Sequence, residues 1–285
     1  MPMHKLVLPI VLTFMTTGCA MFGGGKQAVS DVAGAIDQAE NAVDGAEAAV
    51  ATATSAQAGS AGRAIAAEVM RQHPMISDKP LLEYVNKVGQ YVAMHINPSE
   101  KSVRCADSRP MVKPAKGIRV AVISSDDADA FSVPGGFIFV PSGLVAKLRS
   151  EDQLAGVIAH EMMHTMCGDD VPANVAAAAT DPGSLVSDAM TKPYTRPQLQ
   201  AADRAAVVAL YRAGYYPNHY IRHVYENEEA GKHSAGKARS PFMQKDVAKL
   251  SSKIERTVDA RRARYEKFQR GVLTAASKAS VGGVN

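Results

Sequence analysis

The string His160-Glu161-Met162-Met163-His164, set in a mostly apolar run, constrains the fold more than any other feature of the sequence. The run opens with Glu151 and Asp152, and Gly168 follows it. Acidic residues in the first turn and glycine just beyond the last turn are typical of an α-helix. The sequence therefore predicts a helix over residues 151–166 that carries two imidazoles and a carboxylate.

The spacing of these polar residues indicates a metal site. Residues four apart share one face of a helix, so His160 and His164 can bind one Zn²⁺ while Glu161 leans toward the same ion. In such a site the carboxylate acts as the general base, because it takes a proton from metal-activated water and passes it to the leaving amine. Two histidines merely packed on a buried helix are the alternative.

The surrounding sequence predicts an α+β fold. Short β-branched or aromatic runs at 117–124, 130–133 and 136–141, with a Pro134-Gly135-Gly136 turn, indicate a small antiparallel sheet beside the metal-binding helix. Helical patterns cover 79–96, 142–148, 198–212, 218–228 and 244–270. One small sheet followed by helices is an α+β order.

The N-terminus is typical of an exported chain. Basic residues, then an apolar run from Leu6 to Met15, precede Cys19. The run is shorter than the ~20 residues that cross a bilayer, so residues 1–18 are predicted to be a signal peptide. Residues 16–19 resemble a bacterial lipobox, although Thr16 stands where leucine is usual. That resemblance implies a lipid anchor on Cys19 and, with Ala20 next, the outer membrane facing the periplasm; an ordinary signal peptide is the alternative.

Residues 19–62 are predicted to be a glycine spacer and an Ala-rich helical linker. Apolar residues follow a heptad seam between Val29 and Val50, which suits either self-association through residues 26–62 or a spacer. The predicted domain that carries the metal site spans 63–235, and residues 236–285 are predicted to form a basic helix and tail. The basic stretch 256–270 suits anionic lipid or a solvated helix face.

Net charge and a second histidine pair bear on two further classes of ligand. The formal net charge is +4 with both signs interspersed, so nothing in it indicates nucleic-acid binding. His219 and His223 are also four apart, but no carboxylate stands in register with them, which favours an ordinary exposed pair.

Between residues 79 and 225 the chain resembles zinc metallopeptidases of the HtpX, Oma and CAAX-prenyl-protease type, which have a gluzincin His-Glu-x-x-His, and especially their small periplasmic lipoprotein members. The resemblance rests on residues 129–136 (Asp-Ala-Phe-Ser-Val-Pro-Gly-Gly), the motif at 160–164, Ala202-Asp203-Arg204 and residues 213–217 (Ala-Gly-Tyr-Tyr-Pro). It implies a zinc endopeptidase that cleaves misfolded envelope proteins. It also implies that an extended substrate pairs with the edge formed by Phe131, Ser132, Val133, Pro134, Gly135 and Gly136.

The chain departs from the family at the third metal ligand. The family's glutamate, three residues before Ala-Asp, corresponds to Leu199, which cannot bind a metal. Catalytic zinc normally has three protein ligands. Asp203, four residues further on the same helix face, is either a substitute ligand or, as usual in the family, the partner of a ligating histidine.

Two further departures favour a second reading of the site. The family's late His-Pro followed by Arg finds its best match at Ser240-Pro241 with Asp246, so both polar anchors are predicted to be absent. Met163 and Asp169 stand where relatives often carry glycine and histidine. The alternative function is therefore an inactive peptidase-fold lipoprotein that serves as a binding or chaperone module.

The three cysteines fit an exported protein. If Cys19 carries the lipid, Cys105 and Cys167 remain as a candidate disulfide pair, which would join a loop to the end of the metal-binding helix.

Overall fold

The computed structural model describes residues 58–98, 103–109, 111–171, 180–227, 233, 236–250 and 258–282. They belong to one compact unit that begins at residue 53. Cys19 and residues 26–57 lie outside the described residues, so the signal peptide, the lipid anchor and the heptad segment stay predictions. No helix among the described ranges is long and apolar enough to cross a membrane.

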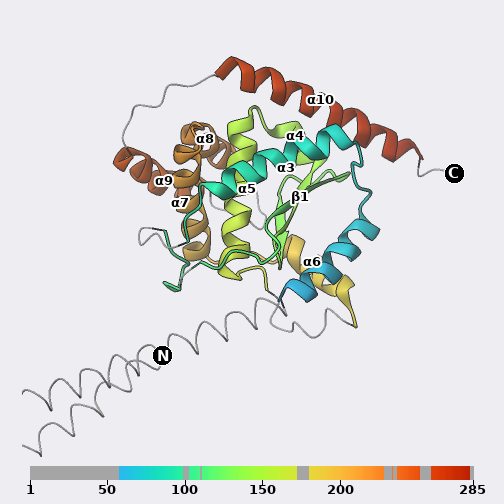
Figure 1. Cartoon of the computed structure of the whole chain (residues 1–285), viewed down its shortest axis with the longest axis horizontal. Coiled ribbons are helices and arrows are strands. Elements are labelled where there is room, and N and C mark those ends of the chain that lie inside the picture. Colours follow the sequence, from blue (N-terminus) through green and yellow to red (C-terminus); the bar gives the residue numbers. More distant parts are fainter. Residues whose placement is uncertain are drawn as a thin grey trace, which may run out of the picture. The chain divides into compact units, whose positions relative to one another are not determined.

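The predicted α+β class is confirmed, since a small sheet is surrounded by helices (Figure 1). A helix over residues 58–72 comes first. The named elements follow in the order α3 (Lys79–Met94), β1 (Arg119–Ile123), β2 (Phe131–Val133), β3 (Phe137–Pro141), α4 (Ser142–Lys147), α5 (Glu151–Cys167), α6 (Pro182–Thr191), α7 (Arg196–Arg212), α8 (Pro217–Glu226), α9 (Gly236–Lys249) and α10 (Val258–Gly282).

The sheet is mixed, so the predicted antiparallel sheet is wrong in one pairing. β2 and β3 form the expected antiparallel hairpin across the Pro-Gly-Gly turn, but β1 pairs with β3 in parallel. The strand order is β1-β3-β2, because the chain crosses from β1 to the far side before it turns back. β2 therefore lies at an edge of this sheet.

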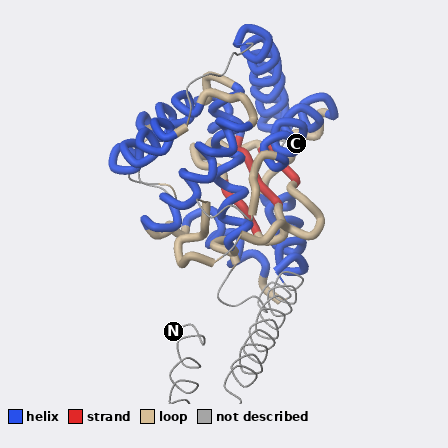
Figure 2. The backbone as a smooth tube through the Cα atoms, turned by 60° about the vertical axis from the view of Figure 1, so that its left-hand side comes forward, coloured by secondary structure: helices blue, strands red, loops and turns tan. Residues whose placement is uncertain are grey.

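The strands separate two layers of helices, and their side chains alternate between them. Ile138 and Val140 join a main core with α3 and α5, whereas Phe137 and Phe139 join a second core with α6 and the helix over 58–72. This alternation is the period of two that a strand dictates. Figure 2 shows the strands between these helices.

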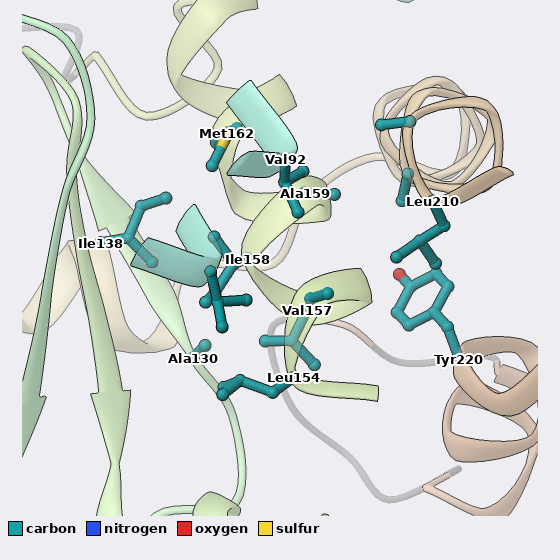
Figure 3. Packing of buried hydrophobic residues seen from close by; sticks show 14 of the residues in the cluster. Val92, Ala130, Ile138, Leu154, Val157, Ile158, Ala159, Met162, Leu210 and Tyr220 are labelled. Carbon is teal, nitrogen blue, oxygen red and sulfur yellow. The ribbon is translucent and has the colours of Figure 1, made fainter. Parts of the chain in front are cut away.

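Helix α5 is the centre of the main core. Every residue in it except Thr165 is buried, as expected for a helix packed on all sides. Figure 3 shows Ile138 of the sheet on one side of Ile158, and Leu210 of α7 with Tyr220 of α8 on the other. The predicted helix ends are confirmed, because Ser150 caps the N-terminus and Gly168 adopts a left-handed conformation at the C-terminus.

The single helix predicted for 244–270 is wrong, since α9 ends at Lys249 and α10 begins at Val258. α9 also starts earlier than predicted, at Gly236, and contains Pro241. Proline cannot donate to the carbonyl four residues before it. That carbonyl, of Lys237, accepts instead from Ser240 Oγ at 3.3 Å, which makes the proline tolerable.

Helix α6, which the sequence did not predict, covers β2 from the second core. Leu185 and Val186 of α6 pack in one cluster with Phe131 and Val133. Asp181 caps this helix and Pro182 opens it. The apolar residues of α6, Leu185, Val186, Ala189 and Met190, span less than two turns, which is too short to give a clear helical period.

Gly62 brings the first described helix against the hairpin turn. A Cβ at this position would lie 1.6 Å from the Pro134 carbonyl oxygen. The contact fixes the turn that joins β2 to β3, where Gly135 and Gly136 both have positive φ. Only glycine permits this approach of two backbones.

We predict that Gly62→Ala destabilises the protein by several kcal/mol, although alanine is the better helix former by about 1 kcal/mol. The added methyl has no room beside Pro134. Gly59→Ala, in the same helix with nothing within 4 Å of its new Cβ, is the matched control and should be neutral or slightly stabilising. Urea unfolding of both variants measures the difference; equal stabilities would contradict the close contact.

Candidate active site

Two nitrogens face each other on helix α5. His160 Nε2 and His164 Nε2 lie 3.1 Å apart, and both side chains are buried. Each Nδ1 faces a carboxylate, Asp203 at 3.0 Å and Asp169 at 2.9 Å. Because a carboxylate only accepts hydrogen bonds, the proton of each neutral ring lies on Nδ1, and both Nε2 atoms present lone pairs to one another.

His164 is held from three sides. Its Nδ1 donates to Asp169 Oδ2, and Gln198 Nε2 of α7 donates to the other oxygen of that carboxylate at 2.9 Å. The ring of Tyr194 stacks on the imidazole with centroids 3.6 Å apart. Asp169 follows the left-handed Gly168, so the end of α5 places the carboxylate beside the ring.

His160 is positioned by a buried ionic cluster. Asp203 of α7 accepts from His160 and, through both oxygens, from Arg239 of α9 at 2.6 and 2.8 Å. The Tyr220 hydroxyl donates to the same carboxylate at 3.1 Å and lies 3.0 Å from His160 Nδ1. Three helices thus converge on one imidazole.

Gly156 allows Tyr220 to reach this cluster. A Cβ on Gly156 would lie 2.4 Å from the Tyr220 ring. Gly156 is one turn before His160 on α5, so the tyrosine lies flat against the helix with its hydroxyl at the histidine. The glycine that lowers helix propensity is therefore needed for packing.

His233, from the segment between α8 and α9, completes a group of three. One ring nitrogen from each of His160, His164 and His233 lies within 4.8 Å of the others. Sequence reasoning missed His233. It predicted that the late polar anchors were absent, and that is wrong, because His233 and Arg239 have the same six-residue spacing as the rejected Ser240 and Asp246.

The six-residue spacing between His233 and Arg239 is the one sequence signal that identifies these two residues. Ser234 follows His233 where the family pattern has proline, so this position does not match His-Pro. Neither Tyr194 nor Tyr220 stands at a position that the motifs mark. Both are placed by tertiary packing.

The three histidines fit a divalent metal. Imidazole nitrogens suit zinc and its neighbours in the first transition row. Two nitrogens bound to one tetrahedral zinc are about 3.4 Å apart, close to the 3.1 Å separation of the two Nε2 atoms. Two facing lone pairs repel unless a cation lies between them. His233 Nε2 is buried and lies 2.9 Å from Glu161 Oε1, without the geometry of a hydrogen bond.

Burial and charge set the protonation states of this site. Burial lowers the pKa of His160, and it lowers the pKa of His164 to about 3, so both rings are neutral. Burial would raise the pKa of Asp203, but the Arg239 guanidinium and His160 outweigh it and hold that pKa well below its usual range. The carboxylate is therefore ionised throughout the neutral range.

The Glu161 carboxylate contacts the third histidine. Its Oε1 is 2.9 Å from His233 Nε2. Burial opposes protonation of His233, yet Glu161 and Asp129 raise its pKa. The carboxylate that the sequence predicts as the general base thus contacts one of the three histidines, and its catalytic role stays a prediction.

Asp203 stands behind His160. It contacts Nδ1, which points away from the Nε2 that faces His164. This position favours the alternative in which Asp203 orients a ligating histidine over the alternative in which it binds the metal itself. Leu199, one turn earlier on α7, is buried with 3% of its surface exposed.

The predicted substrate edge lies next to α5, and its residues are covered. Phe131, Ser132 and Val133 are all buried in β2. Pro134, Gly135 and Gly136 form the turn that follows. The structure brings this edge to the metal-binding helix, with α6 on its other side.

His219 and His223 do not form a second metal group among the described residues. His219 Nδ1 contacts Asp152 at 3.1 Å, and His223 contacts the side chain of Asn227. Each imidazole thus has a local partner.

Cys105 and Cys167 are joined by a disulfide with a Cα–Cα distance of 5.5 Å. The bond ties the loop before β1 to the last residue of α5. Val112 N also donates to the Met166 carbonyl at 2.8 Å. The end of the helix that carries His164 is thereby held by a covalent bond and a main-chain bond.

The model of Peptidase family M48 matches residues 100–257, which include all three histidines and Glu161. The chain belongs to peptidase family M48. This confirms the resemblance inferred from the motifs.

Two M48 relatives are similar over parts of the chain. The Beta-barrel assembly-enhancing protease of Escherichia coli (strain K12) is 31% identical over 91 residues, which are 32% of this chain and 16% of that protein. The Mitochondrial metalloendopeptidase OMA1 of Schizosaccharomyces pombe is 27% identical over 133 residues, 41% of this chain and 39% of that protein. The chain thus spans well under half the length of either relative.

We predict that Arg239→Met destabilises the M48 domain by about 3 to 5 kcal/mol, because it leaves the Asp203 carboxylate charged and unpaired in the core. Guanidinium unfolding provides the measurement. Arg222→Met, at an exposed position of α8, is the matched control and should change the unfolding free energy by less than about 0.5 kcal/mol.

The same ion pair has a pH signature. Since the pKa of Asp203 is lower folded than unfolded, its stabilising effect is complete at neutral pH and is lost as the pH falls below about 4. The wild type should therefore lose stability more steeply between about pH 5 and pH 3 than Asp203→Asn does. Equal slopes would contradict an ionised Asp203.

Proposed function

We propose that this M48 chain is a zinc-dependent endopeptidase whose metal is held by His160, His164 and His233. The main support for this proposal is that three buried or nearly buried imidazoles converge, and that the Glu161 carboxylate contacts one of them. When bound, zinc supplies an acidified water and a Lewis acid for the scissile carbonyl.

The residues of the chain would divide the remaining tasks. Glu161 would accept a proton and pass it to the leaving nitrogen. Asp203 and Asp169 would keep the two ring protons on Nδ1, so that each Nε2 stays free to bind metal. The β2 edge would bind an extended substrate through main-chain hydrogen bonds, which requires α6 or its flanking loops to move aside.

The location and the substrate are also part of the proposal. The lipobox-like start supports an outer-membrane lipoprotein that faces the periplasm, and the name of the Escherichia coli relative refers to β-barrel assembly. We therefore propose misfolded envelope proteins as substrates. The heptad seam at 26–62 supports self-association, which sedimentation of the chain with and without those residues would test.

We expect the purified chain to hold near-stoichiometric zinc and to cleave casein. Glu161→Gln should keep the zinc but lower kcat by at least about 100-fold, because the general base is lost. His233→Ala should lower zinc affinity strongly, because two protein ligands remain where catalytic zinc normally has three. Metal analysis after dialysis against buffered zinc measures both effects.

Failure to bind zinc after metal loading would reject the endopeptidase proposal. Zinc binding that is unchanged in His233→Ala would reject His233 as a ligand and leave the rest of the proposal standing.

Leu199 favours one other function, that of an inactive peptidase fold used as a binding or chaperone module. The substitution Leu199→Glu separates the two. If His233 completes the ligand set, the new carboxylate should change zinc affinity less than about tenfold. If the natural chain is a disabled enzyme, it should cleave casein no faster than Glu161→Gln does. In that case Leu199→Glu should raise both zinc affinity and casein cleavage above those of the natural chain.

A further inference from the structure

The third histidine, His233, has a carboxylate near each nitrogen of its ring. Nε2 is buried and lies 2.9 Å from Glu161 Oε1 of α5. Nδ1 lies 3.8 Å from Asp129 Oδ1, in the loop just before β2. Nε2 is therefore the inner nitrogen, on the side of the metal-binding helix, and Nδ1 is left for Asp129.

Asp129 is placed at His233 as two other carboxylates are placed at the histidines of α5. Asp203 and Asp169 lie 3.0 and 2.9 Å from the Nδ1 atoms of those two rings. A carboxylate at Nδ1 accepts the proton of a neutral imidazole and leaves the Nε2 lone pair for a metal. Each histidine of the group thus has a carboxylate at the same ring nitrogen.

Asp129 is not itself a member of the group that can hold one ion. Among the described residues, the ligand atoms that lie within 4.8 Å of one another belong to the three histidines and to no carboxylate. Asp129 therefore reaches the proposed metal through the imidazole of His233 and not as a ligand.

The backbone that carries Asp129 is held on both sides. Before it, Gly143 N at the start of α4 donates to the Ser125 carbonyl at 2.8 Å. A Cβ on Gly143 would lie 2.5 Å from the Asp126 carbonyl oxygen, so the loop rests directly on this helix. After it, Ala130 is buried in the main core and β2 begins. A fixed backbone allows one short side chain to position a ring.

The main chain of His233 is also held, but that bond does not orient its ring. Arg239 Nη1 donates to the His233 carbonyl at 2.7 Å, and the same guanidinium binds Asp203. A bond to the main chain leaves the side-chain torsions open, so the orientation of the imidazole depends on what its two nitrogens contact.

The contact with Asp129 differs from the other two in exposure and length. The Asp129 side chain is 41% exposed, against 8% for Asp169 and 2% for Asp203. The 3.8 Å separation is about 1 Å longer than a hydrogen bond, a gap that an exposed carboxylate has room to close by rotation. His233 is thus the most weakly positioned of the three histidines.

We propose that Asp129 is the positioning residue of His233, because it accepts the Nδ1 proton and so directs Nε2 toward the metal. The inference rests on the proposed function, since it requires that His233 binds zinc. It adds that a residue at the entry to β2, the proposed substrate edge, sets how firmly the third ligand is held.

The test is the zinc affinity of the full-length chain, measured by competition with a chelator of known affinity. Asp129→Ala should lower that affinity about 10- to 100-fold, the usual effect of removing a group that orients a ligating histidine. Asp129→Asn should recover most of the loss, because its amide oxygen accepts the same N–H. Asp126→Ala removes the same charge from an exposed position of the same loop, so this matched control should bind zinc as the wild type does.

A double-mutant cycle separates positioning from a general effect on the fold. In the His233→Ala background, Asp129→Ala should change zinc affinity less than about twofold, because the ring that it orients is gone. Asp129→Leu keeps the volume of the side chain without the acceptor. It should behave as Asp129→Ala does, and it covers the case in which the alanine variant fails to fold.

The inference is overturned if Asp129→Ala and Asp126→Ala bind zinc equally well while His233→Ala binds it weakly, and the proposed zinc site then still stands. A loss of the same size with and without His233 overturns it too, because Asp129 would then act through another group. A wild type that binds no zinc rejects the proposed function itself, and this inference with it.

Discussion

The carboxylate of Asp203 is the interaction on which the site depends. It is buried, and it is shared by a histidine of α5, an arginine of α9 and a tyrosine of α8. A charge in that environment is tolerated only with such partners. The four helices α5, α7, α8 and α9 therefore take up one arrangement, and the same arrangement directs His160 Nε2 toward His164.

The site is a cluster of polar side chains inside a buried core. Helix α5 is packed on all sides, yet it carries two histidines and a glutamate at its centre. Each ring proton is committed to a carboxylate, and each carboxylate to a second donor, Arg239 or Gln198. What remains uncommitted in this network is the set of nitrogen lone pairs, which is what a metal site requires.

Much of this was predictable from sequence, and the failures have physical causes. Period and end signals predicted α5 and the β2–β3 hairpin, because both depend on residues close in the chain. The parallel pairing of β1 was missed, because strand order depends on how loops cross. His233 was missed because it reaches the site only through the packing of α8 and α9, and because a serine follows it where proline was sought. Helix α6 was missed because its apolar residues, at 185, 186, 189 and 190, span less than two turns.

The contact of Gly62 with Pro134 couples the position of the first described helix to the turn between β2 and β3. That helix begins the described part of the chain, and its backbone rests on the turn that ends the β2 edge. A shift of this helix would therefore displace the turn between β2 and β3, because no space separates the two backbones. The position of the first described helix and the shape of the edge strand are thus linked by two backbones in direct contact.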